Sequence, residues 1–152
     1  MDSAATRNVA LLSIYPEFAD QIFAGSKTIE LRRIQLPDEL EHVVVYATSP
    51  VMKIVGYFDV AEIVRDTPAN IWKQYRAVAG IDRKRFFSYY ESRNMAVGIK
   101  IGRIHPLPIP RKLSFLAKKL TPPQSIQYLP QSYVAKLQAC IAQKRASPLI
   151  GA

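Results

Sequence analysis

The sequence is poor in metal-binding and redox-active side chains, with one cysteine, Cys140, and two histidines among 152 residues. A lone thiol cannot form an internal disulfide, and one cysteine with two histidines cannot complete a zinc site of the CxxC or Cys/His type. We therefore expect no metal and no cofactor, and a reducing, cytoplasmic setting. Cys140 is expected to be a small core residue.

Long hydrophobic runs are also missing. The longest wholly apolar runs, such as residues 43–47, fall far short of the roughly 20 residues that a membrane span needs. Residues 1–8 lack the basic segment and apolar stretch of a signal peptide. Secretion and membrane insertion are therefore not expected. A composition of 49% hydrophobic and 22% charged residues excludes a disordered or fibrous chain.

No Gly/Ser linker and no internal repeat divides the chain. We expect one domain over residues 1–152, because single cores usually contain about 100 to 200 residues. Its core would cover about 9–104, and a basic extension with a helix would cover about 105–145. The ends, 1–7 and 146–152, are expected to be flexible.

Acidic residues are absent after Glu91. Residues 1–91 hold 11 Lys/Arg and all 12 Asp/Glu, whereas residues 92–152 hold the other 10 Lys/Arg, so the net charge of +9 belongs to the C-terminal segment. Such a segment should attract a polyanion, of which nucleic acid is the favoured one. An acidic protein, an anionic membrane surface and simple solvation of the charges are the alternatives.

Hydrophobic periodicity and turn residues predict an α+β fold with a small, curved or barrel-like sheet of about five to six mixed strands. Gly56 marks a bulge or close approach within one long strand, while Pro106, Pro108 and Pro110 exclude both a helix and a central strand. The expected strands are 9–14, 28–34, 42–47, 53–64 and 95–101, and the expected helices are 16–24, 68–79, one starting after Asp82, and 131–145.

The segment with the most chemical content is Gly25–Arg33. Lys27 follows a tight turn, and Glu30 and Arg32 share one strand face through the period of two. A lysine can hold a phosphate or, if desolvated, lose its proton and act as a base, and Arg32 offers a planar fork for phosphate. We expect Lys27 to be exposed. The alternative to a binding site is a surface ion-pair cluster. A P-loop is not supported, because no glycine directly precedes Lys27.

Four segments together resemble an ASCH domain of the PUA-like superfamily: Ser13–Ala19, Gly25–Arg32 with its GxKxxExR pattern, Tyr46–Pro50 and Ile54–Gly56. The resemblance covers about residues 9–104. It implies a PUA-like β-barrel with helices at its rim and a cleft beside the motif that binds RNA or a nucleoside.

The same resemblance leaves activity open. Members of the family include RNA-binding or coactivator-linked modules, ribonucleases, and amidohydrolases that deacetylate N4-acetylcytidine with a lysine, a threonine three residues later and a separate glutamate. Lys27 matches the lysine, but Glu30 stands at the threonine position. The leading hypothesis is an RNA-binding protein, with single-stranded RNA or a modified nucleoside as its ligand. The alternative is a small hydrolase with Lys27 and Glu30 as catalytic residues, and regulation through DNA or a protein partner is a third possibility.

Candidate contacts follow from the motif, the strand ends and the basic segment. Tyr15 could stack on a base, and Ser49 could donate to a phosphate. The rigid loop 122–125 is either a connector or a wall of the cleft, and His42 and His105 are expected to be structural or exposed. The predicted nucleic-acid contacts are Tyr15, Lys27, Arg32, Arg33, Ser49, Lys53, Lys100 and Arg103.

Overall fold

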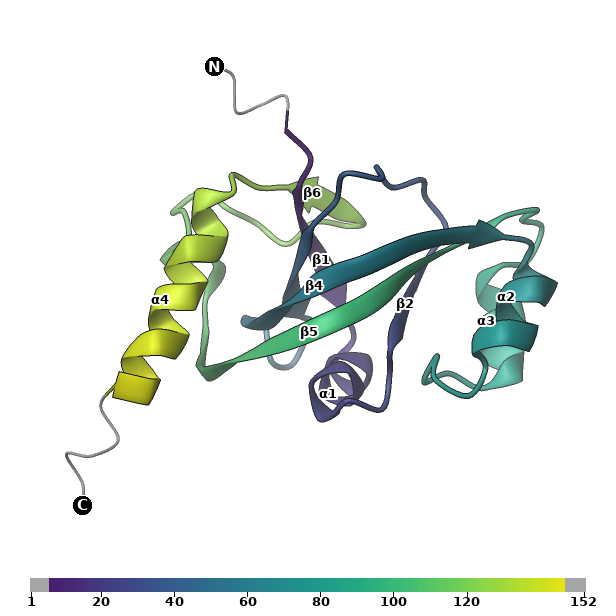
Figure 1. Cartoon of the computed structure of the whole chain (residues 1–152), viewed down its shortest axis with the longest axis horizontal. Coiled ribbons are helices and arrows are strands. Elements are labelled where there is room, and N and C mark those ends of the chain that lie inside the picture. Colours follow the sequence, from purple (N-terminus) through teal and green to yellow (C-terminus); the bar gives the residue numbers. More distant parts are fainter. Residues whose placement is uncertain (1–5, 147–152) are drawn as a thin grey trace.

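Six strands form one mixed sheet in the computed structural model, which describes residues 6–146 and their side chains to residue 143. The expected flexible ends lie outside the described residues, apart from residues 6, 7 and 146. The strand order is β2-β5-β4-β3-β1-β6, with β1 and β3 parallel and the other neighbours antiparallel (Figure 1). The strands are β1 (Val9–Ile14), β2 (Ile29–Arg32), β3 (His42–Ala47), β4 (Lys53–Asp66), β5 (Ala96–Arg111) and β6 (Ile126–Tyr128).

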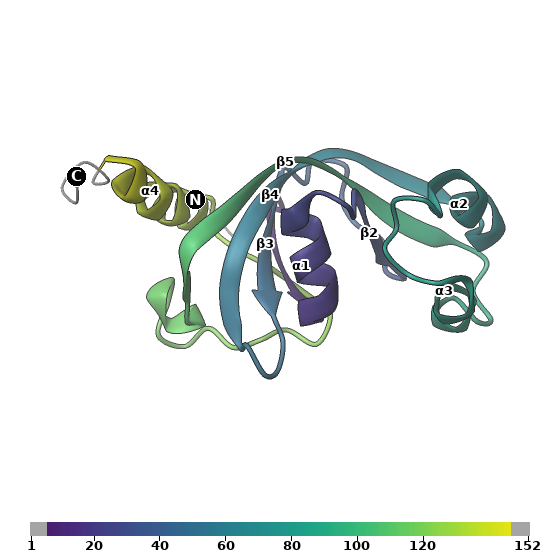
Figure 2. The same cartoon turned by 90° about the horizontal axis from the view of Figure 1, so that it is seen from below.

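Helices cover the concave side and both ends of this curled sheet. Figure 2 shows α1 under the arch of β4 and β5, with α4 at one end of the molecule and the α2–α3 pair at the other. No helix among residues 6–146 is long and apolar enough to cross a membrane. The helices are α1 (Pro16–Ala24), α2 (Pro68–Tyr75), α3 (Arg83–Tyr89) and α4 (Ser132–Ala146), and a 3-10 turn, η2, covers Leu113–Phe115.

The expected helix boundaries are confirmed at three capping positions. Gly25 ends α1 with a φ of 88°, which favours glycine. The Thr67 hydroxyl accepts a hydrogen bond from the Asn70 amide at 3.2 Å, and the Asp82 carboxylate caps α3. The prediction that the helix after Thr67 continues to residue 79 is wrong, because α2 ends at Tyr75. The chain then turns, and the Val78 carbonyl oxygen accepts a hydrogen bond from the Thr28 N–H group at 2.9 Å.

Side chains alternate between the two faces of the sheet and build separate clusters. Leu12 and Val45 pack with Ile22 of α1 on the concave face, and their neighbours Leu11 and Val44 pack with Leu137 of α4 on the other. A third cluster seats α2 and α3 on β2 through Ile71 and Phe86 against Ile29 and Leu31. Full burial of such a side chain stabilises the fold by about 1.5–3 kcal/mol, so the third cluster fixes α3 beside β2.

The expected end of a strand at residue 101 is wrong, because β5 continues to Arg111 through all three prolines. Its pairing with β2 stops at Lys100, and beyond that point only β4 lies beside it. This part of β5 is therefore an edge of the sheet. Proline has no N–H group to donate, but at an edge there is no second neighbouring strand that would need this hydrogen bond. The expectation that the prolines exclude a central strand thus agrees with the structure. The expectation that the strand ends at residue 101 does not.

Gly56 occupies the bulge and close approach that the sequence predicted. The pairing of β3 with β4 slips by one residue between Val45 and Tyr46, opposite Gly56. A Cβ atom on Gly56 would lie 2.7 Å from both the His105 carbonyl oxygen and the Phe23 ring. Strand β6 was not predicted, because three residues between turns carry too short a pattern to read.

Candidate nucleic-acid interface

A cleft of about 810 Å³ opens between α1 and α3, with β2 as its floor. Figure 2 shows β2 between these two helices. The lining of the cleft contains six cationic side chains and a single acidic one, Glu30. The cleft is lined by Ser13, Ile14, Tyr15, Phe18, Lys27, Glu30, Leu31, Arg32, Arg33, Ile34, Ile81, Lys84, Arg85, Ser88, Tyr89, Arg93, Gln124 and Ser125.

Lys27 is buried in the floor of this cleft, which corrects the expectation of an exposed lysine. Only 3% of the residue is accessible, and its Nζ donates a hydrogen bond to the Ala79 carbonyl oxygen. Gly80 makes this approach possible, since a Cβ there would lie 2.0 Å from the Gln21 side chain and 3.2 Å from Lys27 Cδ. The turn after α2 therefore closes over the lysine.

Glu30 and Arg32 lie together on one face of β2, as the period of two predicted. The guanidinium of Arg32 binds one carboxylate oxygen of Glu30, with Nε at 3.0 Å and Nη2 at 2.8 Å. The other carboxylate oxygen lies 3.9 Å from Lys27 Nζ. Because Glu30 is itself only 6% exposed, this is a buried network rather than the surface ion-pair cluster considered as an alternative.

Arg32 also ties the loop at residues 122–125 to the floor. Its Nη2 donates to the Ser13 carbonyl at 3.1 Å, and its Nη1 donates to the Ser125 carbonyl at 3.4 Å. The Ser13 hydroxyl adds a hydrogen bond to the Pro123 carbonyl at 2.8 Å. The loop is therefore a wall of the cleft, and Arg32 positions it.

Burial changes the acid–base properties of the floor. Desolvation lowers the pKa of Lys27, an effect that the Glu30 carboxylate opposes and the Arg32 guanidinium reinforces. A lysine with a lowered pKa releases its proton more readily than an exposed one. The Lys27 ammonium group in the floor therefore holds its proton less firmly than an exposed lysine does.

The cations at the rim are more available than those in the floor. Arg33 is exposed, with its guanidinium 4.7 Å from the centre of the Tyr89 ring. Arg85 contacts Glu17 at 3.2 Å and lies 4.9 Å from the centre of the Phe18 ring. Among residues 6–143, Arg33, Lys84 and Arg93 form no ion pair. These three side chains can each meet an external anion.

The predicted contacts divide into two groups. Tyr15, Lys27, Arg32 and Arg33 line the cleft together with Glu30, whereas the other four lie elsewhere. Lys100, for example, contacts Glu62 at 3.5 Å. The four residues outside the cleft are Ser49, Lys53, Lys100 and Arg103.

Two of the six cations in the cleft come from a part of the chain that the sequence did not single out. Within the acid-free segment, only Arg93 belongs to the cleft lining, and the side chains of Lys144 and Arg145 lie outside those described. Lys84 and Arg85 were missed. The available signal was the basic run directly after the helix-capping Asp82, which places cations in the first turn of α3.

The two histidines lie away from the cleft and share one partner. His42 Nδ1 and His105 Nε2 lie 3.2 and 3.0 Å from the same Asp59 oxygen, and the His105 ring stacks on Tyr57 at 4.3 Å. This agrees with a structural role. Cys140 is half-buried and packs against the cluster that contains Leu11, Val44 and Leu137, so it lies at the edge of this core. Within the described residues, no three His, Cys, Asp or Glu side chains are grouped as metal ligands are.

Comparison with known families shows to which family the chain belongs. A family model described as the ASCH domain matches residues 12–106, more than half of the sequence. The chain belongs to the ASCH domain family. The ASCH domain-containing ribonuclease of Zymomonas mobilis is 30% identical over 146 residues, which cover 94% of this chain and 99% of that protein.

Solved structures of ASCH proteins share the fold. The crystal structure of the Zymomonas mobilis ASCH protein has a TM-score of 0.79 and 30% identity, and the match covers 88% of this chain and 96% of that one. The N-terminal domain of Staphylothermus marinus McrB has a TM-score of 0.60 at 9% identity, covering 89% and 95%, and shows likeness of fold alone. The predicted PUA-like fold is thus confirmed, as a half-barrel of six mixed strands with a C-terminal helix.

Proposed function

We propose that this ASCH protein binds single-stranded RNA in the cleft between α1 and α3. The observation that carries the proposal is the lining of the cleft, where six cationic side chains face one acid and aromatic rings stand at the rim. Cations neutralise phosphates, and exposed rings stack on unpaired bases. Duplex RNA hides its bases, so a cleft of this kind suits an unpaired segment.

The residues of the cleft would divide the work. Arg33, Lys84 and Arg93 would contact phosphates, because no acid neutralises them within residues 6–143. Tyr15, 62% exposed, would stack on a base. The floor would keep its shape through the network of Lys27, Glu30 and Arg32. The exposed part of this network would contact the ligand. Ser49, Lys53, Lys100 and Arg103 remain proposed contacts for RNA that extends beyond the cleft.

Cleavage of RNA is the second candidate function. It is favoured by the relative from Zymomonas mobilis, whose name is that of a ribonuclease and which aligns along almost its whole length. In cleavage of RNA by transesterification, a base removes the proton of a ribose 2′-hydroxyl, and the 2′-oxygen attacks the adjacent phosphorus to form a 2′,3′-cyclic phosphate. An acid protonates the 5′-oxygen as its bond to phosphorus breaks. Lys27, with its lowered pKa, and Glu30 are the proposed catalytic residues.

One experiment separates binding from turnover. Single-stranded RNA, duplex RNA and DNA of one sequence, each fluorescently labelled, are titrated with protein by anisotropy and then analysed on denaturing gels. RNA binding in the cleft predicts a preference for single-stranded RNA and a log affinity that falls with log salt by roughly 0.7 per phosphate contacted. Affinity that does not depend on salt, or that is equal for all three ligands, would contradict it.

Variants identify the site and the reaction. Arg33→Ala should weaken binding without unfolding the protein, because the side chain is exposed. Product that disappears with Glu30→Gln while RNA is still bound would show ribonuclease activity, and release of acetate from N4-acetylcytidine would instead show the amidohydrolase reaction. Preferential binding of DNA would favour regulation through DNA.

The proposed compartment is the cytoplasm. Its basis is the lone, half-buried Cys140, a usage typical of reducing compartments, where thiols stay free. Fractionation of cells that express the tagged protein would test this.

A further inference from the structure

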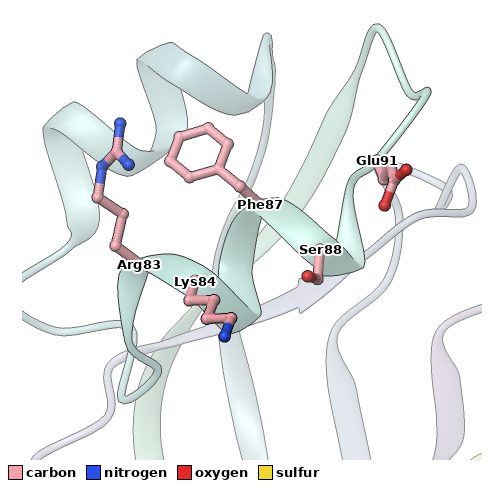
Figure 3. A pocket seen from close by; sticks show the side chains of 5 residues that line it. All are labelled: Arg83, Lys84, Phe87, Ser88 and Glu91. Carbon is pink, nitrogen blue, oxygen red and sulfur yellow. The ribbon is translucent and has the colours of Figure 1, made fainter.

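A second hollow lies on α3, directly beside the cleft. It is an open depression of about 580 Å³, lined by Arg83, Lys84, Phe87, Ser88 and Glu91 (Figure 3). We call it the α3 hollow. Two of its lining residues, Lys84 and Ser88, also line the cleft, so the two depressions meet across one ridge of the helix. A ligand that leaves the cleft over this ridge enters the α3 hollow.

The spacing of residues along α3 explains why the hollow joins the cleft. Side chains four residues apart lie on the same face of a helix. Arg83 and Phe87 form one such pair and Lys84 and Ser88 form the next. Figure 3 shows Arg83 and Phe87 pointing to the same side of α3, with Lys84 and Ser88 below them. The first pair belongs to the hollow alone, and the second forms its border with the cleft.

The chemistry of the α3 hollow matches that of the cleft. The Arg83 guanidinium lies 5.0 Å from the centre of the Phe87 ring, which places a cation beside an aromatic surface. Arg83 is exposed and, like Lys84, forms no ion pair within residues 6–143. Phosphate contact by a cation combined with base stacking on an adjacent ring is how proteins hold single strands.

A free nucleoside could occupy only one of the two depressions. Ligand sites of roughly 300–1,000 Å³ suit a single small molecule, and each depression has a volume within that range. A polymer with repeating phosphates and bases, in contrast, can reach both depressions as one molecule by crossing the Lys84–Ser88 ridge. Two adjoining depressions therefore suit a strand better than a single nucleoside.

We propose that the ligand is an oligonucleotide whose chain passes from the cleft over α3, with Arg83 and Phe87 forming a subsite for a neighbouring nucleotide. This inference rests on the proposed function, because it extends the same RNA site. It names the ligand class as a strand of several nucleotides rather than a free or modified nucleoside.

The test measures affinity against ligand length. Cytidine monophosphate and single-stranded RNAs of two, four and eight nucleotides are titrated against the full chain, by NMR shifts for the shortest and anisotropy for the others. Wild-type affinity should rise from the mononucleotide to the longer strands. Arg83→Glu should lower the affinity for the eight-nucleotide strand by about tenfold and leave the mononucleotide unaffected. Arg83→Ala should reduce the salt slope by roughly 0.7 for each lost phosphate contact.

A matched control makes a similar change of charge at a position outside both depressions. Lys73 lies exposed on α2, the neighbouring helix, and lines neither depression, so Lys73→Glu should have little effect. Phe87→Leu, which keeps an apolar side chain against Trp72 and Phe86, tests stacking without emptying the cluster. It should weaken long strands only.

The possible failures are distinguishable. Equal effects of Arg83→Glu and Lys73→Glu, with Arg33→Ala still weakening RNA binding, would overturn the α3 subsite and leave the cleft intact. Affinity that does not change from the mononucleotide upward would also overturn it. If the wild-type protein binds no RNA of any length, both the subsite and the proposed function fail.

Discussion

Arg32 binds Glu30 through two nitrogens of one guanidinium, at 3.0 and 2.8 Å from the same carboxylate oxygen, across two positions of one strand. The side chain of Arg32 is only 12% exposed, and its remaining N–H groups reach carbonyls at the end of β1 and in the loop at 122–125. A single residue thus joins three separate segments that line the cleft. Arg32 is a positioning residue first, and only its remaining exposed edge can meet a ligand.

We expect Arg32→Lys to lower the free energy of unfolding by about 2–3 kcal/mol, measured by urea denaturation. A lysine keeps the charge but offers no planar fork, so it cannot hold Glu30 and both carbonyls together. Faster amide exchange at residues 122–125 should accompany the loss.

Arg85→Lys is the matched control for that change. Arg85 also makes an ion pair, at 3.2 Å, but the side chains of Arg85 and of its partner Glu17 are 46% and 55% exposed. Exposed pairs contribute about 0–1 kcal/mol, so the control should lose far less. Equal losses in the two variants would contradict the view that burial makes the Arg32 network important.

Lys27 should make stability depend on pH in the alkaline range. Burial lowers its pKa in the folded protein below the ordinary 10.5, so between those two values the unfolded chain binds more protons than the native one. Stability therefore rises with pH across this window, as the cost of burying the charge disappears. In Lys27→Met this contribution is absent.

The measurement compares melting temperatures of the wild type and Lys27→Met from pH 7 to pH 11. The difference, wild type minus variant, should become more positive through the window. Lys112→Met, an exposed lysine away from the cleft, supplies the control and should show no such trend. A difference that stays flat, or that moves the other way, would show that Lys27 titrates as an exposed lysine does.

The sequence could predict local features of this site, because local spacing determines them. The shared face of Glu30 and Arg32 follows from strand periodicity, and the start of β2 follows from the helix stop at Gly25. The same kind of signal predicted where α2 and α3 begin. Each of these features depends on residues within a few positions of one another.

The features that escaped prediction depend on contacts between distant segments. Lys27 is buried by Ala79 and Gly80, more than fifty positions away, so nothing near it in the chain marks the burial. Lys84 and Arg93 enter the cleft only because packing on β2 brings α3 and the turn after it there. Strand β5 passes through its prolines because its pairing with β2 covers only Val97–Lys100 and leaves the prolines on an edge. Tertiary packing decided all three.

Gly56→Ala should destabilise the fold by about 2 kcal/mol or more. The added methyl group would lie 2.7 Å from the His105 carbonyl oxygen, a backbone atom in the β4–β5 ladder, and equally close to the Phe23 ring. Gly102→Ala is the control, since the atoms nearest to its Cβ belong to Asp59, and the nearest of them, the carbonyl oxygen, would lie 3.2 Å away. We expect a clear fall in the urea midpoint for the first variant and a much smaller one for the second. Two equal midpoints would show that the β4–β5 ladder adjusts to the added methyl group.

Tyr15→Ala should weaken RNA binding by about tenfold with little change in melting temperature. The ring is mostly exposed at the rim of the cleft and lies tilted against Phe18, with the ring centres 6.3 Å apart, so the fold loses little with it. Stacking on one base contributes about 1–3 kcal/mol by alanine substitution, and Tyr15→Phe should retain most of it. Ile109→Ala removes a similarly exposed apolar side chain outside the cleft and should leave the affinity unchanged. If Tyr15→Ala and Ile109→Ala bind single-stranded RNA equally well by anisotropy, the base does not stack at this position, and the aromatic part of the interface must lie at Phe18 or Tyr89.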